Sequence, residues 1–159
     1  MRVSAKVDYA MRAMVQLAAS GGGAPMTAER IAEAQGVPQK FLQNILLELR
    51  RAGLVESHRG PDGGHTLARP PATISVADVI RAVDGPLGSV AGHAPEHTEY
   101  RGAAVRLRDT WVALRASVRG VLENISIADI AEDELPAAVA ALIGDEDAWV
   151  RRQGLSRSL

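Results

Sequence analysis

The first part of the chain has the hydrophobic spacing of amphipathic helices. In residues 4–19 apolar side chains recur at positions i, i+3, i+4 and i+7, and Ser4 is placed to cap a helix there. The glycine-rich stretch 21–25 ends this helix. Thr27 is a suitable N-cap for a second, short helix over residues 28–35. The pattern therefore predicts two successive helices before residue 36.

A third helix is predicted after a tight turn at Gly36 and Val37. Pro38 suits its first turn, and Gly53 ends it. Its apolar stripe, which we expect to face the core, consists of Phe41, Leu42, Ile45, Leu46 and Leu49. The second and third helices are thus two short helices joined by a tight turn.

The pattern then changes to that of short strands. Residues 54–59 and 65–68 flank the turn-rich segment Gly60-Pro61-Asp62-Gly63-Gly64, which predicts a β-hairpin. Ser75 can cap a fourth helix over residues 76–83. Helix, helix, turn, helix, hairpin is the order of elements in a winged helix-turn-helix domain.

The second half of the chain is predicted to contain one long helix after a loop. Residues 85–100 lack periodicity, and from about residue 103 apolar side chains line one helix face for more than five turns. That face consists of Leu107, Trp111, Leu114, Val118, Val121, Leu122 and Ile125. This apolar face packs either against a partner or, as the alternative, against the rest of its own domain. Ser126 with Asp129 resembles a capping box that starts another helical turn, and the Ala-rich tail 133–152 is predicted to be helical.

Composition narrows the class of protein. The 159 residues include no cysteine and only 3% aromatics, so the core must consist largely of Ala, Leu, Val and Ile, which favours packed helices. The missing thiols exclude a disulfide scaffold, a Cys-ligated zinc finger and a cysteine nucleophile. Apolar runs fall short of the ~18–20 residues that span a bilayer, so we expect a cytoplasmic protein with no membrane partner. The first 70 residues are net basic and the remainder net acidic, which fits a nucleic-acid-binding head on a different body.

The third helix carries the candidate chemistry for DNA recognition. Its N-terminal end exposes Gln39, Lys40, Gln43 and Asn44, and amide side chains can bond adenine bidentately. Arg50 and Arg51 are placed to hold phosphates, and Arg59 beside the turn glycines Gly60, Gly63 and Gly64 suits a narrow minor groove. The alternative is that the polar positions form an ordinary solvated helix face. The order of helix pair and Arg-bearing hairpin favours DNA binding.

Catalysis and metal binding have little support in the sequence. No Lys-Ser/Thr pair follows the glycine-rich turn as in a P-loop, and no Ser has a nucleophile-elbow context, so we expect no enzyme. His93, Glu96, His97 and Glu99 have donor types that bind zinc, but Pro95 opposes a helix that would align both imidazoles. A polar loop without metal is the favoured interpretation, and whether His93 and His97 bind an ion stays open.

Several segments resemble the Rrf family of bacterial winged-helix regulators, of the IscR, NsrR and CymR type. They are MRVSAKVDYAMRAM, GVPQKFLQNILLELRRAGLVESHRGPDGGHTLARP, ISVADVIRAVDG and TWVALRASVRGVLENISIADI, and they span roughly residues 1–130. The resemblance implies a homodimer, joined through the long helix, that binds a palindromic operator. It also implies contacts to bases or backbone from Lys40, Phe41, Gln43 and Asn44, a minor-groove contact from Arg59 and a phosphate contact from Tyr9.

The chain departs from the family where many relatives hold an iron–sulfur cluster. Those relatives carry three cysteines before the long helix, whereas residues 86–105 contain none here. Thiolates normally hold such clusters, so no cluster or other cofactor is expected. Asp8 matches a position that supplies an oxygen ligand in some relatives, and without the cysteines it is interpreted as a surface or capping acid.

The sequence thus predicts a mainly α protein with a small β-hairpin wing. A winged helix-turn-helix domain (1–85) is followed by a loop (86–102) and by a dimerisation helix with a helical tail (103–159). The predicted function is a homodimeric, sequence-specific DNA-binding regulator, interpreted as a repressor, with a protein or small-molecule effector. The alternative is a protein-interaction module, or a regulator controlled by a partner protein rather than by a cofactor.

Overall fold

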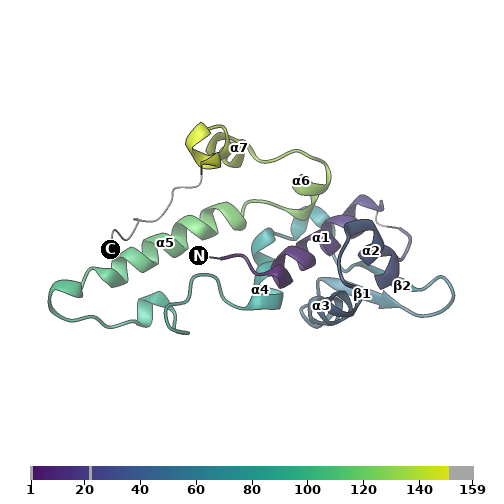
Figure 1. Cartoon of the computed structure of the whole chain (residues 1–159), viewed down its shortest axis with the longest axis horizontal. Helices are drawn as coiled ribbons and strands as arrows, with labels where there is room; N and C mark the ends of the chain where they lie inside the picture. The colour runs from purple at the N-terminus through teal and green to yellow at the C-terminus, as the bar shows by residue number, and fades with distance from the viewer. Residues whose placement is uncertain (1, 22, 151–159) are drawn as a thin grey trace, which may run out of the picture.

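The computed structural model describes residues 2–21 and 23–150. A head of helices with a two-stranded hairpin lies at one end, and helix α5 extends away from it with the loop that precedes it running alongside (Figure 1). The helices are α1 (Ala5–Ala19), α2 (Ala28–Gln35), α3 (Gln39–Arg51), α4 (Val76–Asp84), α5 (Leu107–Leu122), α6 (Ile127–Ala131) and α7 (Ala137–Ile143). The strands are β1 (Val55–His58) and β2 (Gly64–Leu67), and short 3₁₀ turns occur at η1 (Pro71–Thr73), η2 (Pro95–His97), η3 (Gly102–Ala104) and η4 (Glu146–Trp149). The mainly α fold with a small hairpin is confirmed.

The first helices begin and end where local sequence signals place them. The Ser4 side chain accepts a hydrogen bond from the Val7 backbone N–H, and Thr27 caps α2 in the same way through Arg30. Gly36 ends α2 in the left-handed conformation, with φ of 62°. Each cap satisfies backbone groups that would otherwise lack a partner at the helix terminus.

The core of the head lies where α1, α2 and α3 meet. Its largest fully buried side chains there are Met14, Ile31, Leu42, Leu46 and Leu49, all of which share one cluster. The expected stripe of α3 is therefore buried except for Phe41, which is 64% exposed. Phe41 precedes Leu42 by one residue, so it lies about 100° away from it around the helix and misses the core.

The hairpin is held by a contact that the sequence did not reveal. β1 and β2 pair antiparallel with Val55 opposite Leu67 and His58 opposite Gly64. The backbone N–H of Met26 donates to the carbonyl of His65 at 3.0 Å, and the N–H of His65 donates back at 2.8 Å. The segment before α2 thus adds one bridge to the outer edge of β2, which fixes the hairpin against the helices.

The chain returns to the head after α5. The backbone N–H of Val76 donates to the Ile125 carbonyl, and that of Ile127 donates to the Ile74 carbonyl, both at 2.9 Å. Ile127 is fully buried in the head core, and the predicted Ser126 box, closed by Asp129, starts α6. Residues 125–131, expected in the C-terminal part of the chain, therefore pack against the head.

Helix α5 is shorter than the sequence pattern suggested. It begins at Leu107 after the turn η3 and ends at Leu122, so Ile125 lies beyond it and is buried beside Val76 and Val139. The expectation that Ile125 lies on the apolar face of the long helix is wrong, because the chain bends back to the head there. The predicted tail contains α7 and η4, and residues 151–159 lie outside the described part.

Candidate nucleic-acid interface

The buried stripe of α3 fixes the direction of its polar side chains. Leu42, Ile45, Leu46 and Leu49 point into the core, so the opposite face of the helix is left in solvent. Its exposed members include the predicted Gln39, Lys40, Gln43 and Asn44, together with Phe41. The structure therefore brings five of the predicted recognition residues to one surface at the start of α3.

Most of these side chains have no hydrogen-bond or ion-pair partner among the described residues. Across residues 2–21 and 23–150, no hydrogen bond or ion pair engages the side chains of Lys40, Gln43 or Asn44. Gln39 differs, because its Nε2 donates to Glu29 Oε1 at 2.5 Å and ties the start of α3 to α2. Lys40, Gln43 and Asn44 thus present unused donors and acceptors, as a DNA-reading surface requires.

The hairpin tip presents Arg59 on a slim turn. Arg59 is exposed at the end of β1, and the Gly63 backbone N–H donates to the Gly60 carbonyl at 3.0 Å to close the turn. A Cβ on Gly63 would lie 2.4 Å from the His58 carbonyl oxygen, and one on Gly64 would lie 2.6 Å from the Met26 backbone. The sequence predicts that Gly63 and Gly64 contact DNA. The structure gives a separate reason for glycine at both positions, because only a hydrogen fits there.

The remaining predicted contacts flank this surface. Arg50 and Arg51 are exposed in the last turn of α3, where cations also complement the helix dipole. Tyr9 is half-buried and packs against the head core from α1. Asp8 is paired with Arg12, one turn later on α1, at 2.8 Å, consistent with a surface acid.

His65 gives the hairpin a titratable group on β2, one pair away from the turn. Its Nδ1 lies 3.2 Å from Ser57 Oγ across the hairpin. Partial burial lowers the pKa of His65 below its ordinary value of 6.5, and the nearby charge of Arg50 lowers it further, while Glu29 opposes the shift. The folded chain therefore binds fewer protons at this position than the unfolded chain as the pH falls towards 6.5.

Acidification is expected to destabilise the head through His65. A folded-state pKa below 6.5 means that the free energy of unfolding falls as the pH drops through about 6.5, and that this loss levels off below the folded pKa. Urea denaturation between pH 8 and pH 5 measures the slope for the natural chain and for His65→Gln. The variant should show a flatter dependence in this window, and equal slopes would contradict the assignment.

The face of α5 predicted for dimerisation is only partly free. No residue of α5 is fully buried, and Leu107 and Leu114 are among its exposed side chains. Trp111 Nε1 donates to the Tyr100 hydroxyl at 3.1 Å, so the preceding loop covers one part of the stripe. Val121 and Leu122 pack against the cluster of Val76, Ile125 and Val139 at the other end. The middle of the helix, around Leu114 and Val118, remains accessible between these contacts.

Comparison with known proteins identifies the family. The family model described as "Rrf2: Iron-dependent Transcriptional regulator" matches residues 3–133. The chain belongs to the Rrf2 family. Among Rrf2 relatives, a Mycobacterium tuberculosis chain named as an HTH-type transcriptional regulator is 49% identical over 158 residues, covering 99% of this chain and 98% of its own length. CymR of Bacillus subtilis is 31% identical, covering 82% of this chain and 90% of the relative.

Solved Rrf2-family structures share the fold. CymR of B. subtilis, titled a global cysteine regulator, matches with a TM-score of 0.72 at 32% identity, over 84% of this chain and 98% of its own. T. potens IscR matches with a TM-score of 0.68 at 31% identity, over 96% and 94%. The protein is thus a DNA-binding transcriptional regulator with a winged helix-turn-helix fold and not an enzyme. In the described residues no helix is long and apolar enough to cross a membrane.

The donor set of this Rrf2 chain does not fit an iron–sulfur cluster. The whole sequence lacks cysteine, and the loop before α5 offers imidazoles, carboxylates and hydroxyls rather than thiolates. Within the described ranges, no three His, Asp or Glu side chains gather as a metal-binding group. The backbone of His93 forms an isolated bridge with that of Val90. The carboxylate of Glu96 pairs with Arg115 at 2.6 Å. Within the described residues of one chain, this sequence therefore offers neither the thiolates of a cluster nor a gathered group of His, Asp or Glu side chains.

Sequence reasoning missed the residues that hold the interface in place. Met26 braces the hairpin through backbone bonds and Glu29 engages Gln39, but neither forms a recognisable motif. Both contacts join segments of different elements, so periodicity within one segment carries no signal for them.

Proposed function

We propose that this regulator represses transcription as a homodimer bound to a palindromic promoter site. The observation that carries the proposal is the unpartnered polar surface at the start of α3 together with exposed Arg59 on the hairpin tip. α3 would enter a major groove, where Lys40, Gln43 and Asn44 reach base edges, and Arg59 would enter the flanking minor groove. Arg50, Arg51 and Tyr9 would hold the phosphates.

The homodimer part of the proposal rests on α5. Its accessible middle around Leu114 and Val118 offers an apolar strip that a second copy of the same helix would cover. A two-fold interface of this kind requires each copy to present the same patch, and it pairs two heads with two half-sites. The protein would work in the cytoplasm, without an iron–sulfur cluster.

Transcription in a purified system tests the repressor assignment. The template carries a promoter overlapping the duplex sequence that the protein selects from random DNA. Adding the protein should reduce the transcript in proportion to site occupancy, and a template with the site scrambled should be unaffected. A rise in transcript would make the protein an activator, and an unchanged transcript at full occupancy would contradict regulation at that position.

A regulator controlled by a partner protein is the second candidate. Leu142, Ile143, Trp149 and Val150 are exposed apolar side chains near the C-terminal end of the described residues, and Trp149, 74% exposed, donates to the Ile143 carbonyl at 2.7 Å. Exposed apolar side chains that gather on one surface are typical of protein-binding sites. Salt separates the two modes, because operator binding should weaken steeply between 50 and 200 mM salt whereas apolar docking should not.

A further inference from the structure

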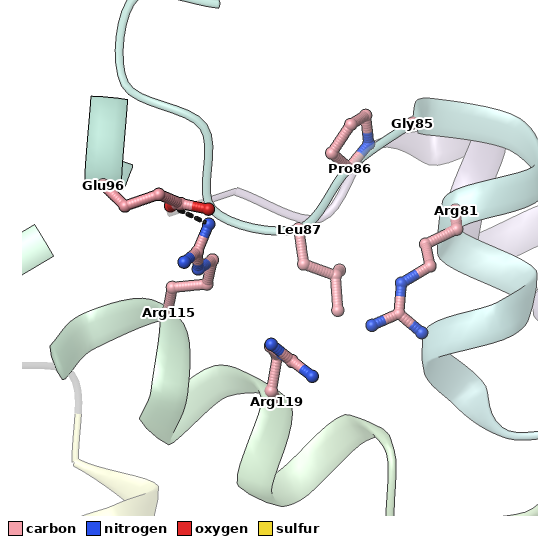
Figure 2. A pocket seen from close by; sticks show the side chains of 7 residues that line it. All are labelled: Arg81, Gly85, Pro86, Leu87, Glu96, Arg115 and Arg119. Carbon is pink, nitrogen blue, oxygen red and sulfur yellow. Dashed lines mark ion pairs between the residues drawn. The ribbon is translucent and has the colours of Figure 1, made fainter. Parts of the chain in front are cut away.

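An open cavity lies where the head meets α5. It measures about 400 Å³ and is lined by Arg81, Gly85, Pro86, Leu87, Glu96, Arg115 and Arg119. Arg81 comes from α4, Glu96 from η2, and Arg115 and Arg119 from successive turns of α5 (Figure 2). Three guanidinium groups from two elements thus border one space, with Leu87 between them.

The charges around this cavity do not balance. Arg81 and Arg119 both donate to the same oxygen, Glu123 Oε1, while Arg115 pairs with Glu96. Asp78 lies 3.8 Å from Arg81 but is shared with Arg69 at 3.9 Å. Four arginines (Arg69, Arg81, Arg115 and Arg119) are thus linked to three carboxylates (Asp78, Glu96 and Glu123). The set carries one net positive charge. Each guanidinium has five N–H donors, so the pairs with these carboxylates do not use all of them.

The residues around Arg115 hold its side chain in place beside the cavity. Its side chain is only 20% exposed, and Gly88, with φ of 66°, brings the preceding loop against its stem. A Cβ at Gly88 would lie 3.0 Å from Arg115 Cγ, so this close approach needs a glycine. Partial removal from water strengthens the interaction of a guanidinium with a negative group.

Both carboxylates at the cavity are charged competitors for these arginines. The Glu96 backbone N–H and the Arg115 guanidinium hold the pKa of Glu96 below its usual range, and Arg81 and Arg119 do the same for Glu123. Glu96 is half-exposed, so its carboxylate can move into solvent when a ligand takes its place beside Arg115. A ligand with more than one oxyanion group can replace Glu96 while its second group meets Arg119.

We propose that this cavity binds a small organic polyanion carrying at least two carboxylate or phosphate groups. Arg115 and Arg119 bind the anionic groups, Arg81 contributes from the head, and Leu87 and Pro86 contact the short apolar part of the molecule. The volume is of the size that small-molecule sites have. A ligand that joins Arg81 on α4 to two arginines on α5 would fix the angle between head and helix. This regulatory consequence rests on the proposed function, whereas the binding site does not.

Calorimetry with citrate and pyrophosphate tests the site on the full chain without DNA, at constant ionic strength, with acetate as the single-charge probe. Saturable binding of one polyanion, at least about tenfold tighter than acetate, is expected. Arg115→Gln and Arg119→Gln should each raise its Kd about tenfold, since loss of one charge-assisted bond has about this effect. Glu96→Gln removes the competitor and should lower the Kd several-fold.

The matched control is Arg108→Gln, which removes the same charge from α5 at a position outside the cavity lining. Circular dichroism confirms that each variant is folded. No saturable binding of either polyanion, or an equal loss in Arg108→Gln and Arg119→Gln, would overturn the site. The proposed function would survive that failure because operator binding is measured without ligand.

Operator titrations with the bound polyanion present test its regulatory effect. A shift in operator Kd in the natural chain and in Arg108→Gln, absent in Arg119→Gln, would support the coupling. An equal shift in all three chains would show competition of free anions with DNA and would overturn it.

Discussion

Leu114→Glu is expected to convert the dimer to monomers and to weaken operator binding at least about a hundredfold. Leu114 is 49% exposed in the middle of α5, where the proposed partner helix packs. In a two-fold interface each copy contributes the substituted residue. Two carboxylates would therefore be buried without partners in apolar surroundings. A monomer contacts only one half-site. Linking the two half-site contacts in a dimer contributes a factor of about 10²–10⁴ to the operator affinity.

Sedimentation equilibrium and operator titration measure the two effects together. The matched control is Ala116→Glu, which adds the same charge to an exposed position of α5 about half a turn away from the Leu114 stripe. This control should remain dimeric and bind the operator normally. A dimer that persists in Leu114→Glu would place the interface elsewhere on the molecule.

Arg59→Ala is expected to weaken operator binding by about tenfold or more while the head remains as stable as before. The guanidinium is exposed at the tip of the hairpin and no contact in the described residues holds it, so its removal leaves the fold intact. In the complex it would lie in the negative potential of a narrow minor groove, where one such contact contributes ~1–3 kcal/mol. Fluorescence anisotropy on operator DNA and thermal unfolding measure binding and stability.

Two comparisons make the Arg59 result specific. Arg59→Lys keeps the charge but loses the planar guanidinium, so it should restore only part of the affinity. Arg108→Ala removes a charge from α5, far along the chain from the hairpin, and should leave the operator affinity nearly unchanged. Normal operator binding by Arg59→Ala would show that the hairpin does not contact DNA.

Local signals explain why the head was predictable from sequence. Ser4 and Thr27 cap their helices as their residue types suggest, and the glycine-rich segment between residues 60 and 64 turns the hairpin. Each of these depends on neighbours within a few residues, so each is visible in one short window of sequence. The same holds for the polar face of α3, because the buried Leu42 stripe fixes its direction.

Contacts between distant segments explain what the sequence did not reveal. Ile125 follows the helical spacing of α5, yet its carbonyl accepts from Val76, so tertiary pairing ends the helix before it. Ile127 completes the head core from a segment that follows α4 only after the loop and α5, and no periodicity marks it. The cavity arginines likewise lie on separate elements, where only the fold brings them together.

Selection of bound duplexes from a random DNA library, followed by sequencing, shows whether the protein reads DNA as a two-fold dimer. We expect enrichment of one inverted repeat whose half-sites are centred about 10 base pairs, or a multiple of this, apart. A/T-rich positions should flank the half-sites where Arg59 enters the minor groove. Failure to enrich any sequence, or enrichment of a single asymmetric site, would contradict a homodimer that reads DNA through α3 and the hairpin.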